Sequence, residues 1–432
     1  MNIQNNSLRF FCLSVVFLLL SGCAATGSWL RDIERPLLLN QPDLALQALE
    51  AAGGSEKDAA LYLVNKGILL RMSGDIAGSI QAFEAAKPLI TFQEATSITD
   101  FASSLTLTEG SDGYQPPAFE QVQLHFYQAL NRMDMGDWEG ARVEAMQINI
   151  LLERRWDGIA PFGGDAAARF LTGIIFEGVG ESDNALIAYR KAYEAYKDRS
   201  TIGGVPVELQ RRLLLLTKRN GFDQEFETFA AEFGEARKLE ALATLETSGD
   251  MGEIILVAST GLIPHRYEAS TTQMDPTSGK VYTMALPALS QPLGTIMGVS
   301  LQRGGELLGK AHPLVDLSVL SQKTLDDQLP GLIAKSIARN VVKNAGANQV
   351  EEQFGLLGGL LANVAAAATE AADIRCWNTL PQYIQVLSVR VKPGTYSDLA
   401  IEYGNAVREP LGQQVSVNAG APTVVSVHRV AL

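Results

Sequence analysis

Side chains that could carry out acid, base or nucleophilic chemistry are few and scattered along the chain. Cys376 follows Arg375, and the candidate bases, His265 and His428, lie far from it in sequence. No GxSxG or SxxK motif is present, and no thiol-protease pattern of His and Asn accompanies Cys376. A hydrolase site assembled from these dispersed residues remains a hypothesis, and a buried structural thiol is the alternative.

Two further features resemble binding motifs but lack the residues or the spacing that the chemistry requires. The stretch GGELLGKA has the glycine and lysine spacing of a phosphate-binding loop, but Ala311 replaces the hydroxyl residue that holds magnesium, and Pro313 blocks the following helix. The four histidines lack the spacing of a metal site; they are His125, His265, His312 and His428. We therefore expect no enzymatic activity, no metal and no cofactor.

The early cysteine has a more specific context. A single basic residue, Arg9, precedes the short apolar run Phe10 to Leu20, which is typical of a signal peptide. The run leads into Leu20-Ser21-Gly22-Cys23, a sequence that resembles the bacterial lipobox. We expect residues 1–22 to be removed and Cys23 to be acylated, and two or three acyl chains hold a protein firmly to a membrane.

Residue 24 indicates the expected location of the protein, and the overall charge argues against one class of partner. Residue 24 is Ala and not Asp, which by resemblance to lipoproteins of Gram-negative bacteria favours the outer membrane, with the protein facing the periplasm. The chain carries 35 Lys and Arg against 48 Asp and Glu, a formal net charge of −13. This balance argues against a nucleic-acid partner.

Three segments of the first half share one pattern of small and apolar residues. Each has a glycine turn, a small residue seven positions earlier and a small residue five positions later, as tetratricopeptide hairpins require for close helix packing. The packing residues that we predict are Gly67, Gly74, Phe83, Ala129, Gly136, Ala141, Gly173, Gly180, Ala185 and Tyr189.

The spacing between the turn glycines is larger than in tandem repeats, which predicts inserts. The largest runs from Thr96 to Glu120, and a second from Arg155 to Asp165. Loops of this kind are either spacers or binding loops. We expect a lipid-anchored linker over residues 23–34 and a tetratricopeptide-like (TPR-like) α-solenoid over residues 35–247.

The composition changes to β-branched runs with Gly and Pro turns over residues 250–432. We expect a β-rich, sandwich-like domain with a helical insertion at about residues 321–372, and hence an α+β multidomain protein. The segment Phe354 to Thr369 has no charge, and both a buried helix and a contact with lipid or a partner remain open.

Taken in order after the lipobox, four segments resemble a poorly characterised family of proteobacterial outer-membrane lipoproteins with tetratricopeptide repeats. The four segments are FEQVQLHFYQALNRMDMGDWEGARVEAMQIN, ARFLTGIIFEGVGESDNALIAYRKAYEAY, GEIILVASTGLIPHR and DIRCWNTLPQYIQVLSVRVKPGTY. The resemblance implies architecture and location but no catalytic residue.

The leading hypothesis is a periplasmic adaptor, anchored to the membrane by its acyl chains, whose concave repeat surface binds envelope proteins. Tyr189, Arg142 and Trp138 are the residues expected near that surface. Peptidoglycan synthesis and outer-membrane assembly are the pathways that related lipoproteins suggest by analogy. The alternatives are a glycan- or lipid-binding role of the β-rich domain and the dispersed hydrolase site.

Overall fold

The computed structural model describes residues 28–97, 113–153, 164–246, 249–274, 281–296, 298–340, 342, 371–404 and 407–432. The signal sequence and Leu20, Ser21, Gly22 and Cys23 lie outside the described residues, as do the middle of both predicted inserts and the segment Phe354 to Thr369.

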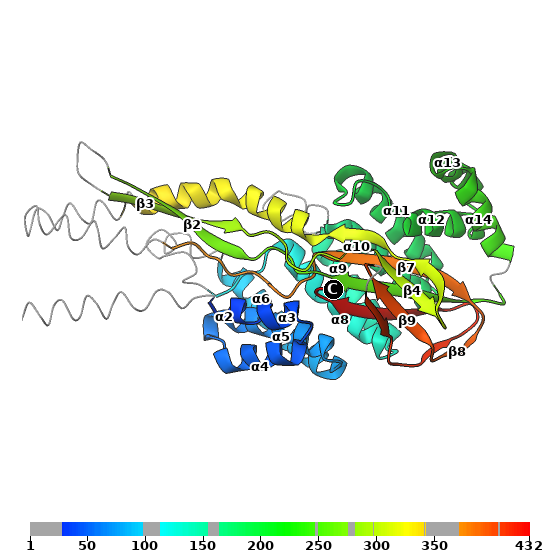
Figure 1. The fold of residues 1–432 in the computed structure, drawn as a ribbon. Helices are drawn as coiled ribbons and strands as arrows, with labels where there is room; N and C mark the ends of the chain where they lie inside the picture. The colour runs from blue at the N-terminus through cyan, green and yellow to red at the C-terminus, as the bar shows by residue number, and fades with distance from the viewer. Residues whose placement is uncertain are drawn as a thin grey trace, which may run out of the picture.

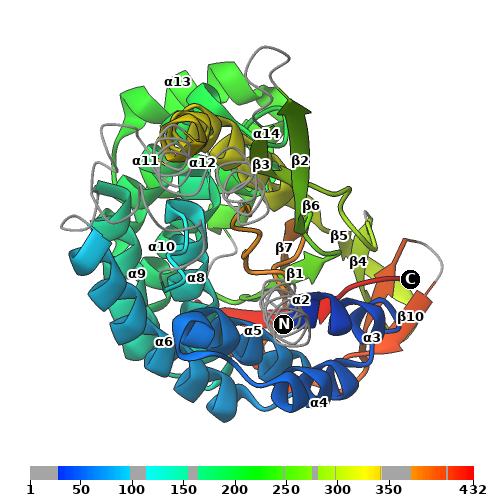
Figure 2. The same cartoon turned by 90° about the vertical axis from the view of Figure 1, so that its left-hand side faces the viewer.

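The first part of the described chain is helical. Its helices are α2 (Ser28–Asp32), α3 (Glu34–Leu38), α4 (Pro42–Ala52), α5 (Ala59–Met72), α6 (Ile76–Ser97), α8 (Ala118–Asp134), α9 (Trp138–Glu153), α10 (Gly164–Gly178), α11 (Ser182–Arg199), α12 (Val207–Arg219), α13 (Asp223–Phe233) and α14 (Glu235–Glu246), with a 3-10 turn η1 (Glu56–Asp58) before α5. Successive helices pack as antiparallel hairpins, and Figure 2 shows them following one another around an arc.

Short glycine turns set the hairpin geometry. Gly74, Gly136 and Gly180 have φ angles of 84°, 74° and 80°, a left-handed conformation that glycine adopts without steric cost. After two of these turns an aspartate begins the next helix, and the carboxylates of Asp75 and Asp137 accept hydrogen bonds from backbone N–H groups three residues later. The chain therefore reverses within a few residues, as the glycine spacing predicts.

The second part is rich in strands. They are β1 (Gly252–Thr260), β2 (Arg266–Met274), β3 (Val281–Leu289), β4 (Val299–Arg303), β5 (Glu306–Lys310), β6 (His312–Asp316), β7 (Tyr383–Val391), β8 (Gly394–Tyr396), β9 (Leu399–Tyr403), β10 (Val407–Pro410), β11 (Val415–Val417) and β12 (Pro422–Arg429). Two four-stranded sheets have the orders β12-β1-β7-β6 and β10-β9-β4-β5, and β11-β8 and β2-β3 form two-stranded pairs. In the first sheet β1 pairs in parallel with β12 and antiparallel with β7.

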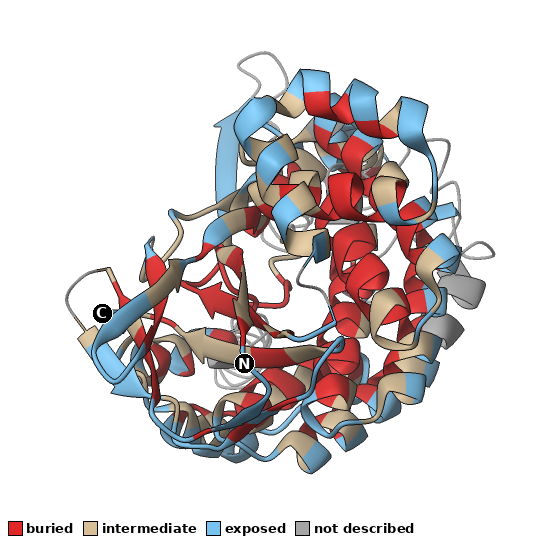
Figure 3. Ribbon diagram, turned by 90° about the vertical axis from the view of Figure 1, so that its right-hand side faces the viewer, coloured by how far each residue is buried: buried red, intermediate tan, exposed pale blue. Residues whose placement is uncertain are grey.

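The central strand β1 is buried on both faces. Ile254 and Leu256 point to a cluster shared with Val299 and Ile401 of the second sheet. The alternate residues of β1, such as Ile255, belong instead to the cluster that fills the helical part. This two-sided burial explains the continuous apolar run GEIILVAST, because a strand with one solvated face would alternate apolar and polar residues. The chain thus has helices, a first sheet and a second sheet in successive layers (Figure 3).

The stretch GGELLGKA, which has the spacing of a phosphate-binding loop, adopts a different structure. Residues 304 and 305 form a two-residue turn between β4 and β5, and both glycines have positive φ angles, 56° and 99°. No helix follows them, since β6 begins at His312. The stretch is a β-hairpin, because β4 pairs antiparallel with β5 across the two-glycine turn.

The predicted helical insertion starts earlier than expected. A helix covers residues 317–340, and the cap is Asp316, whose side chain accepts a hydrogen bond from the backbone N–H of Ser318. The insertion was predicted to begin at about residue 321, which lies one turn after the start of this helix. Figure 1 shows this helix lying along the β2-β3 ribbon, which projects from the rest of the molecule.

Candidate functional site

Two helical hairpins place a glycine directly under an aromatic ring. A Cβ atom built on Gly67 of α5 would lie 2.5 Å from Cε1 of Phe83 on α6. The same atom on Gly173 of α10 would lie 2.2 Å from Cε1 of Tyr189 on α11. Only glycine permits this approach, so the ring of one helix occupies the space that the other leaves.

The other predicted packing residues lie where the repeat pattern puts them. Three predicted small residues have no exposed surface, and the glycines that close the hairpins occupy the turns described above. The three residues are Ala129, Ala141 and Ala185. These contacts give the helical part a TPR-like arrangement.

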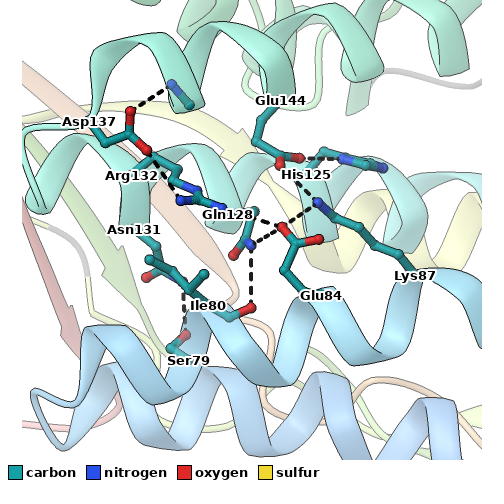
Figure 4. Close-up of polar contacts among 11 residues, drawn as sticks. Ser79, Ile80, Glu84, Lys87, His125, Gln128, Asn131, Arg132, Asp137 and Glu144 are labelled. Carbon is teal, nitrogen blue, oxygen red and sulfur yellow. Dashed lines mark hydrogen bonds and ion pairs between the residues drawn. The ribbon is translucent and has the colours of Figure 1, made fainter.

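A polar network joins neighbouring hairpins across the position of the largest insert (Figure 4). Glu144 on α9 accepts hydrogen bonds from Nζ of Lys87 on α6, at 2.8 Å, and from Nδ1 of His125 on α8, at 2.6 Å. Burial opposes ionisation of Glu144, but the hydrogen bonds and charges of His125 and Lys87 lower its pKa below the usual value. The insert therefore leaves the packing of α6 against α8 and α9 intact.

The inner face of the helical arc is covered by the strand-rich part of the same chain. Helices α5, α8, α10 and α12 contact the strands β12, β6 and β7. Buried residues concentrate where these helices face the strands (Figure 3). An irregular segment before β7, residues 371–382, runs through the same interior and is called the inner segment below.

Trp377 anchors the inner segment. Its side chain is 1% exposed, and its ring centroid lies 5.9 Å from that of Phe83 and 6.5 Å from that of Tyr127. Its indole Nε1 donates to Oγ1 of Thr379 at 2.9 Å. The ring is therefore packed against helices α6 and α8 and fills the space between them.

Charged groups hold the inner segment at its start. Nη1 of Arg375 lies 3.1 Å from Oδ1 of Asp58 in η1, and Nη2 lies 2.8 Å from Oδ2 of Asp373. The backbone N–H of Trp377 donates to Oε1 of Glu120 at 3.3 Å, and the hydroxyl of Tyr114 donates to the same carboxyl group. A buried arginine with two carboxylate partners is a paired charge, as the protein interior requires.

Glu120 is the most perturbed acid of this cluster. Its side chain is buried, and burial raises its pKa to about 7, although the donors Tyr114 and Trp377 favour the ionised form. Sequence analysis placed Glu120 at the end of an insert and gave it no role. No pattern of residues marks it, because its environment is formed by a segment more than 250 positions away.

The end of the inner segment is held by the first helices. Nδ2 of Asn378 donates to Oε1 of Glu34 at 3.2 Å, and the backbone N–H of Thr379 donates to Oδ1 of Asn65 at 3.2 Å. The inner segment thus occupies the position that a bound peptide would take on a repeat surface. The concave repeat surface, which was expected to bind envelope proteins, is filled by this part of the chain.

Of the three residues expected near that surface, Tyr189 is linked to the first sheet. Its partner Glu177 also accepts a hydrogen bond from Arg212, which pairs with Glu253 of β1. Tyr189 has no exposed surface, and its hydroxyl donates to Oε2 of Glu177 at 2.7 Å. Trp138 lies over Gly178 between neighbouring hairpins. Arg142 lies on the outer face, where its Nε donates to Oε1 of Glu181 at 2.6 Å.

A groove of about 200 Å³ lies on the outer face between α9 and α11. Its lining includes Met146, 44% exposed, and Ile187, 47% exposed, with Arg142 and Lys191 at its sides. We call it the first outer groove. It combines exposed apolar side chains with fixed charges at the edges, which is the composition of a protein contact.

A second outer groove, of about 880 Å³, lies between α11 and α13. Phe222 is 44% exposed, and the guanidinium of Arg190 lies 4.8 Å from the centre of its ring. Nε of Arg190 also donates to Oε1 of Glu225 at 2.7 Å. Cation and aromatic ring are therefore fixed relative to each other and face solvent.

Two of the candidates for nucleophilic chemistry, Cys376 and His265, are connected through the side chains of Asn378 and Glu34. The thiol of Cys376 is buried and donates to Oδ1 of Asn378 at 3.0 Å, and burial raises its pKa to about 12. His265 lies 3.1 Å from Glu34, and His428 stacks on Tyr127 with burial lowering its pKa to about 3. A thiol with this pKa is protonated at neutral pH and is a weak nucleophile.

Two further observations concern metals and membranes. Within the described ranges, no three His, Cys, Asp or Glu side chains are grouped closely enough to hold a metal ion. Among the helices of the same residues, none combines the length and the apolar character needed to cross a bilayer.

Comparison with known proteins gives partial structural similarity. No protein family and no curated protein matches the chain. Among solved structures, MamA from Desulfovibrio magneticus RS-1 is 14% identical and covers 51% of this chain and 97% of its own, with a TM-score of 0.32. TPR-like repeats of a kinesin light chain from Podosopora anserina are 12% identical, with coverages of 51% and 94% and a TM-score of 0.33. At these scores the TPR-like description rests on the hairpin packing given above.

Proposed function

We propose that the protein is a lipid-anchored scaffold of the bacterial cell envelope that binds protein partners on the outer face of its helical repeats. The observation that carries the proposal is the contrast between the two faces. The inner face is filled by residues 371–382 and the first sheet, whereas the outer face carries two grooves with exposed apolar side chains.

The exposed residues of α9 form a stripe beside the first outer groove. Val143, Met146 and Ile150 are 53%, 44% and 45% exposed and are spaced three and four residues apart, so they lie on one face of the helix. Ile187 of α11 extends the stripe across the groove. An apolar stripe beside a groove fits the apolar face of a partner helix.

Charged pairs border this stripe. Arg142 is paired with Glu181, and Nζ of Lys191 lies 3.1 Å from Oε1 of Glu153. Apolar contacts surrounded by polar groups are characteristic of specific protein interfaces, since the polar rim fixes orientation while the centre excludes water. The partner that we propose is therefore an amphipathic segment of another envelope protein.

The anchoring part of the proposal comes from the sequence. Acylation of Cys23 would hold the chain at the outer membrane, and α2 begins only five residues later, at Ser28. The helical repeats would then lie close to the periplasmic surface of that membrane. Peptidoglycan synthesis and outer-membrane assembly are the two processes in which we place such a scaffold.

The test is photo-crosslinking in the native host with a photoreactive amino acid at Met146 or at Ile187. The matched control is Leu307 on β5, which is also apolar and 54% exposed but lies on the second sheet. We expect a discrete adduct with an envelope protein from both outer-face positions, lost when Val143→Glu is added. Equal adducts from Leu307, or none from the outer face, would overturn the proposal.

A further inference from the structure

The β2-β3 ribbon and the helix over residues 317–340 form one projecting unit. Near the base, Nη2 of Arg266 donates to Oε1 of Gln328 at 3.2 Å. Towards the far end, Nδ2 of Asn340 donates to the carbonyl oxygen of Thr283 at 2.9 Å. The helix therefore follows the ribbon from base to tip, and Figure 1 shows both extending past α2.

The far end of this unit exposes apolar side chains. Met274, the last residue of β2, is 66% exposed, and Tyr282 on the paired strand is 38% exposed. On the helix, Ile337 is 51% exposed and Val342 is 45% exposed. We call these four residues the tip. Since the hydrogen bond of Asn340 places the end of the helix beside Thr283, the residues of the tip come from elements that lie side by side.

The charge of the tip region differs from that of the whole chain. The described ribbon residues 269–274 and 281–289 contain no charged side chain, and the helix from residue 328 to residue 340 contains no acid. Of its two basic residues, Lys335 is partly exposed, whereas Arg339 is buried at 1% exposure. The connecting residues 275–280 lie outside the described residues and contain one Asp and one Lys. A chain with a net charge of −13 thus has an apolar end at which the accessible described charge is the basic Lys335.

This composition fits the surface of a bilayer with anionic lipids. Apolar and tyrosine side chains enter the boundary between headgroups and acyl chains, and nearby basic residues are attracted to anionic headgroups.

The position of the tip agrees with this occupant. From Cys23 to Ser28 the chain spans five residues, which reach at most about 18 Å when extended. The ribbon projects beyond α2 on the side where the described chain begins (Figures 1 and 2). Resting on the proposed anchoring at Cys23, we infer that Met274, Tyr282, Ile337 and Val342 insert into the interfacial layer of the bilayer and form a second membrane contact.

The experiment uses the mature acylated protein in vesicles of phosphatidylethanolamine and phosphatidylglycerol. Single variants Met274→Cys and Ile337→Cys carry a fluorophore, and Thr228→Cys on the exposed face of α13 is the control. Cys376 is buried and does not compete for the label. Quenching is measured with lipids that carry a nitroxide near the headgroup or deep in the acyl chain.

We expect both tip labels to be quenched several-fold more than the Thr228 label, with shallow nitroxides the more effective, because interfacial side chains enter only about 5–10 Å. Removal of phosphatidylglycerol should weaken this quenching. A protein that sediments with vesicles but whose tip labels match the control would overturn the inference and leave the anchoring proposal standing. Crosslinks between the tip and a second protein, without quenching, would assign the tip to a protein partner and also overturn it.

A protein that fails to sediment with vesicles would instead refute the anchoring at Cys23. In that case the membrane contact of the tip is refuted as well, since the position of the tip at the bilayer was argued from the anchor at Cys23. The sedimentation measurement therefore separates the failure of the proposed function from the failure of the tip contact.

Discussion

At the scale of single residues, two buried ionisable groups have opposite effects on how the stability of the protein depends on pH. Glu120 has its pKa raised by burial from 4.5 to about 7, so the folded protein holds a proton that the unfolded chain releases in this range. His428 has its pKa lowered by burial from 6.5 to about 3, so the folded protein excludes a proton that the unfolded chain binds. Between pH 4.5 and 6.5 the two contributions cancel.

Substitution of one group should reveal the other. In Glu120→Gln the contribution of His428 is no longer compensated, and the free energy of unfolding should fall relative to the original protein by about 1.4 kcal/mol per pH unit between pH 6.5 and pH 4.5. In His428→Phe the difference should have the opposite sign, because acidification then favours the folded state through Glu120. Urea unfolding at three pH values measures both slopes.

The double variant is the control for this pair. Its pH dependence between the same limits should return to that of the original protein, since neither proton remains. Parallel pH profiles for the original protein and both single variants would contradict the assignment of these two pKa shifts.

The residues named in the hypothesis of a dispersed site differ from the residue with the most unusual environment in this region. Cys376 and His428 are reactive types of residue, but the structure buries both without the partner that activation needs. Glu120, which has the unusual pKa, looked like an ordinary loop carboxylate. Burial raises the pKa of Glu120, and burial by a segment distant in sequence leaves no local pattern that could be recognised.

At the scale of elements, small residues and turns predict the helical hairpins well. Glycine turns and the pairing of Gly173 with Tyr189 depend on contacts within one hairpin, and such local contacts appear as a fixed spacing in the sequence. The helix at residues 317–340 was predicted from the same kind of spacing, with an error of one turn at its start. The position of the inner segment was not predictable in this way, because its partners come from α3, η1, α5 and α8.

Gly173→Ala tests the hairpin packing directly. The new Cβ atom would lie 2.2 Å from Cε1 of Tyr189, so the ring must move and its hydrogen bond to Glu177 must break. We expect a loss of about 1–3 kcal/mol in the free energy of unfolding, as in other overpacked interiors. The control is Gly204→Ala, where no atom lies within 4 Å. Equal urea midpoints for the two variants would contradict the packing account.

At the scale of the whole molecule, the helical and strand-rich parts share one core. The largest buried cluster contains Leu49 and Phe83 of the helices together with Ile255 and Trp377. The turn between α3 and α4 also contacts the residues after β12, because Nδ2 of Asn40 donates to the carbonyl oxygen of Ala431 at 2.8 Å. The division of the sequence into a helical and a β-rich segment describes composition, whereas the tertiary contacts join both into one unit.

The central claim is that residues 371–382 occupy the inner face permanently and leave the outer face for partners. Hydrogen exchange of this segment, followed by mass spectrometry of the native protein, tests it most directly. We predict that the amides of Trp377, Thr379 and Leu380 exchange as slowly as those of β1, since both are released only by global unfolding. Fast exchange of the inner segment while β1 remains protected would show that the inner face opens, and would contradict the account.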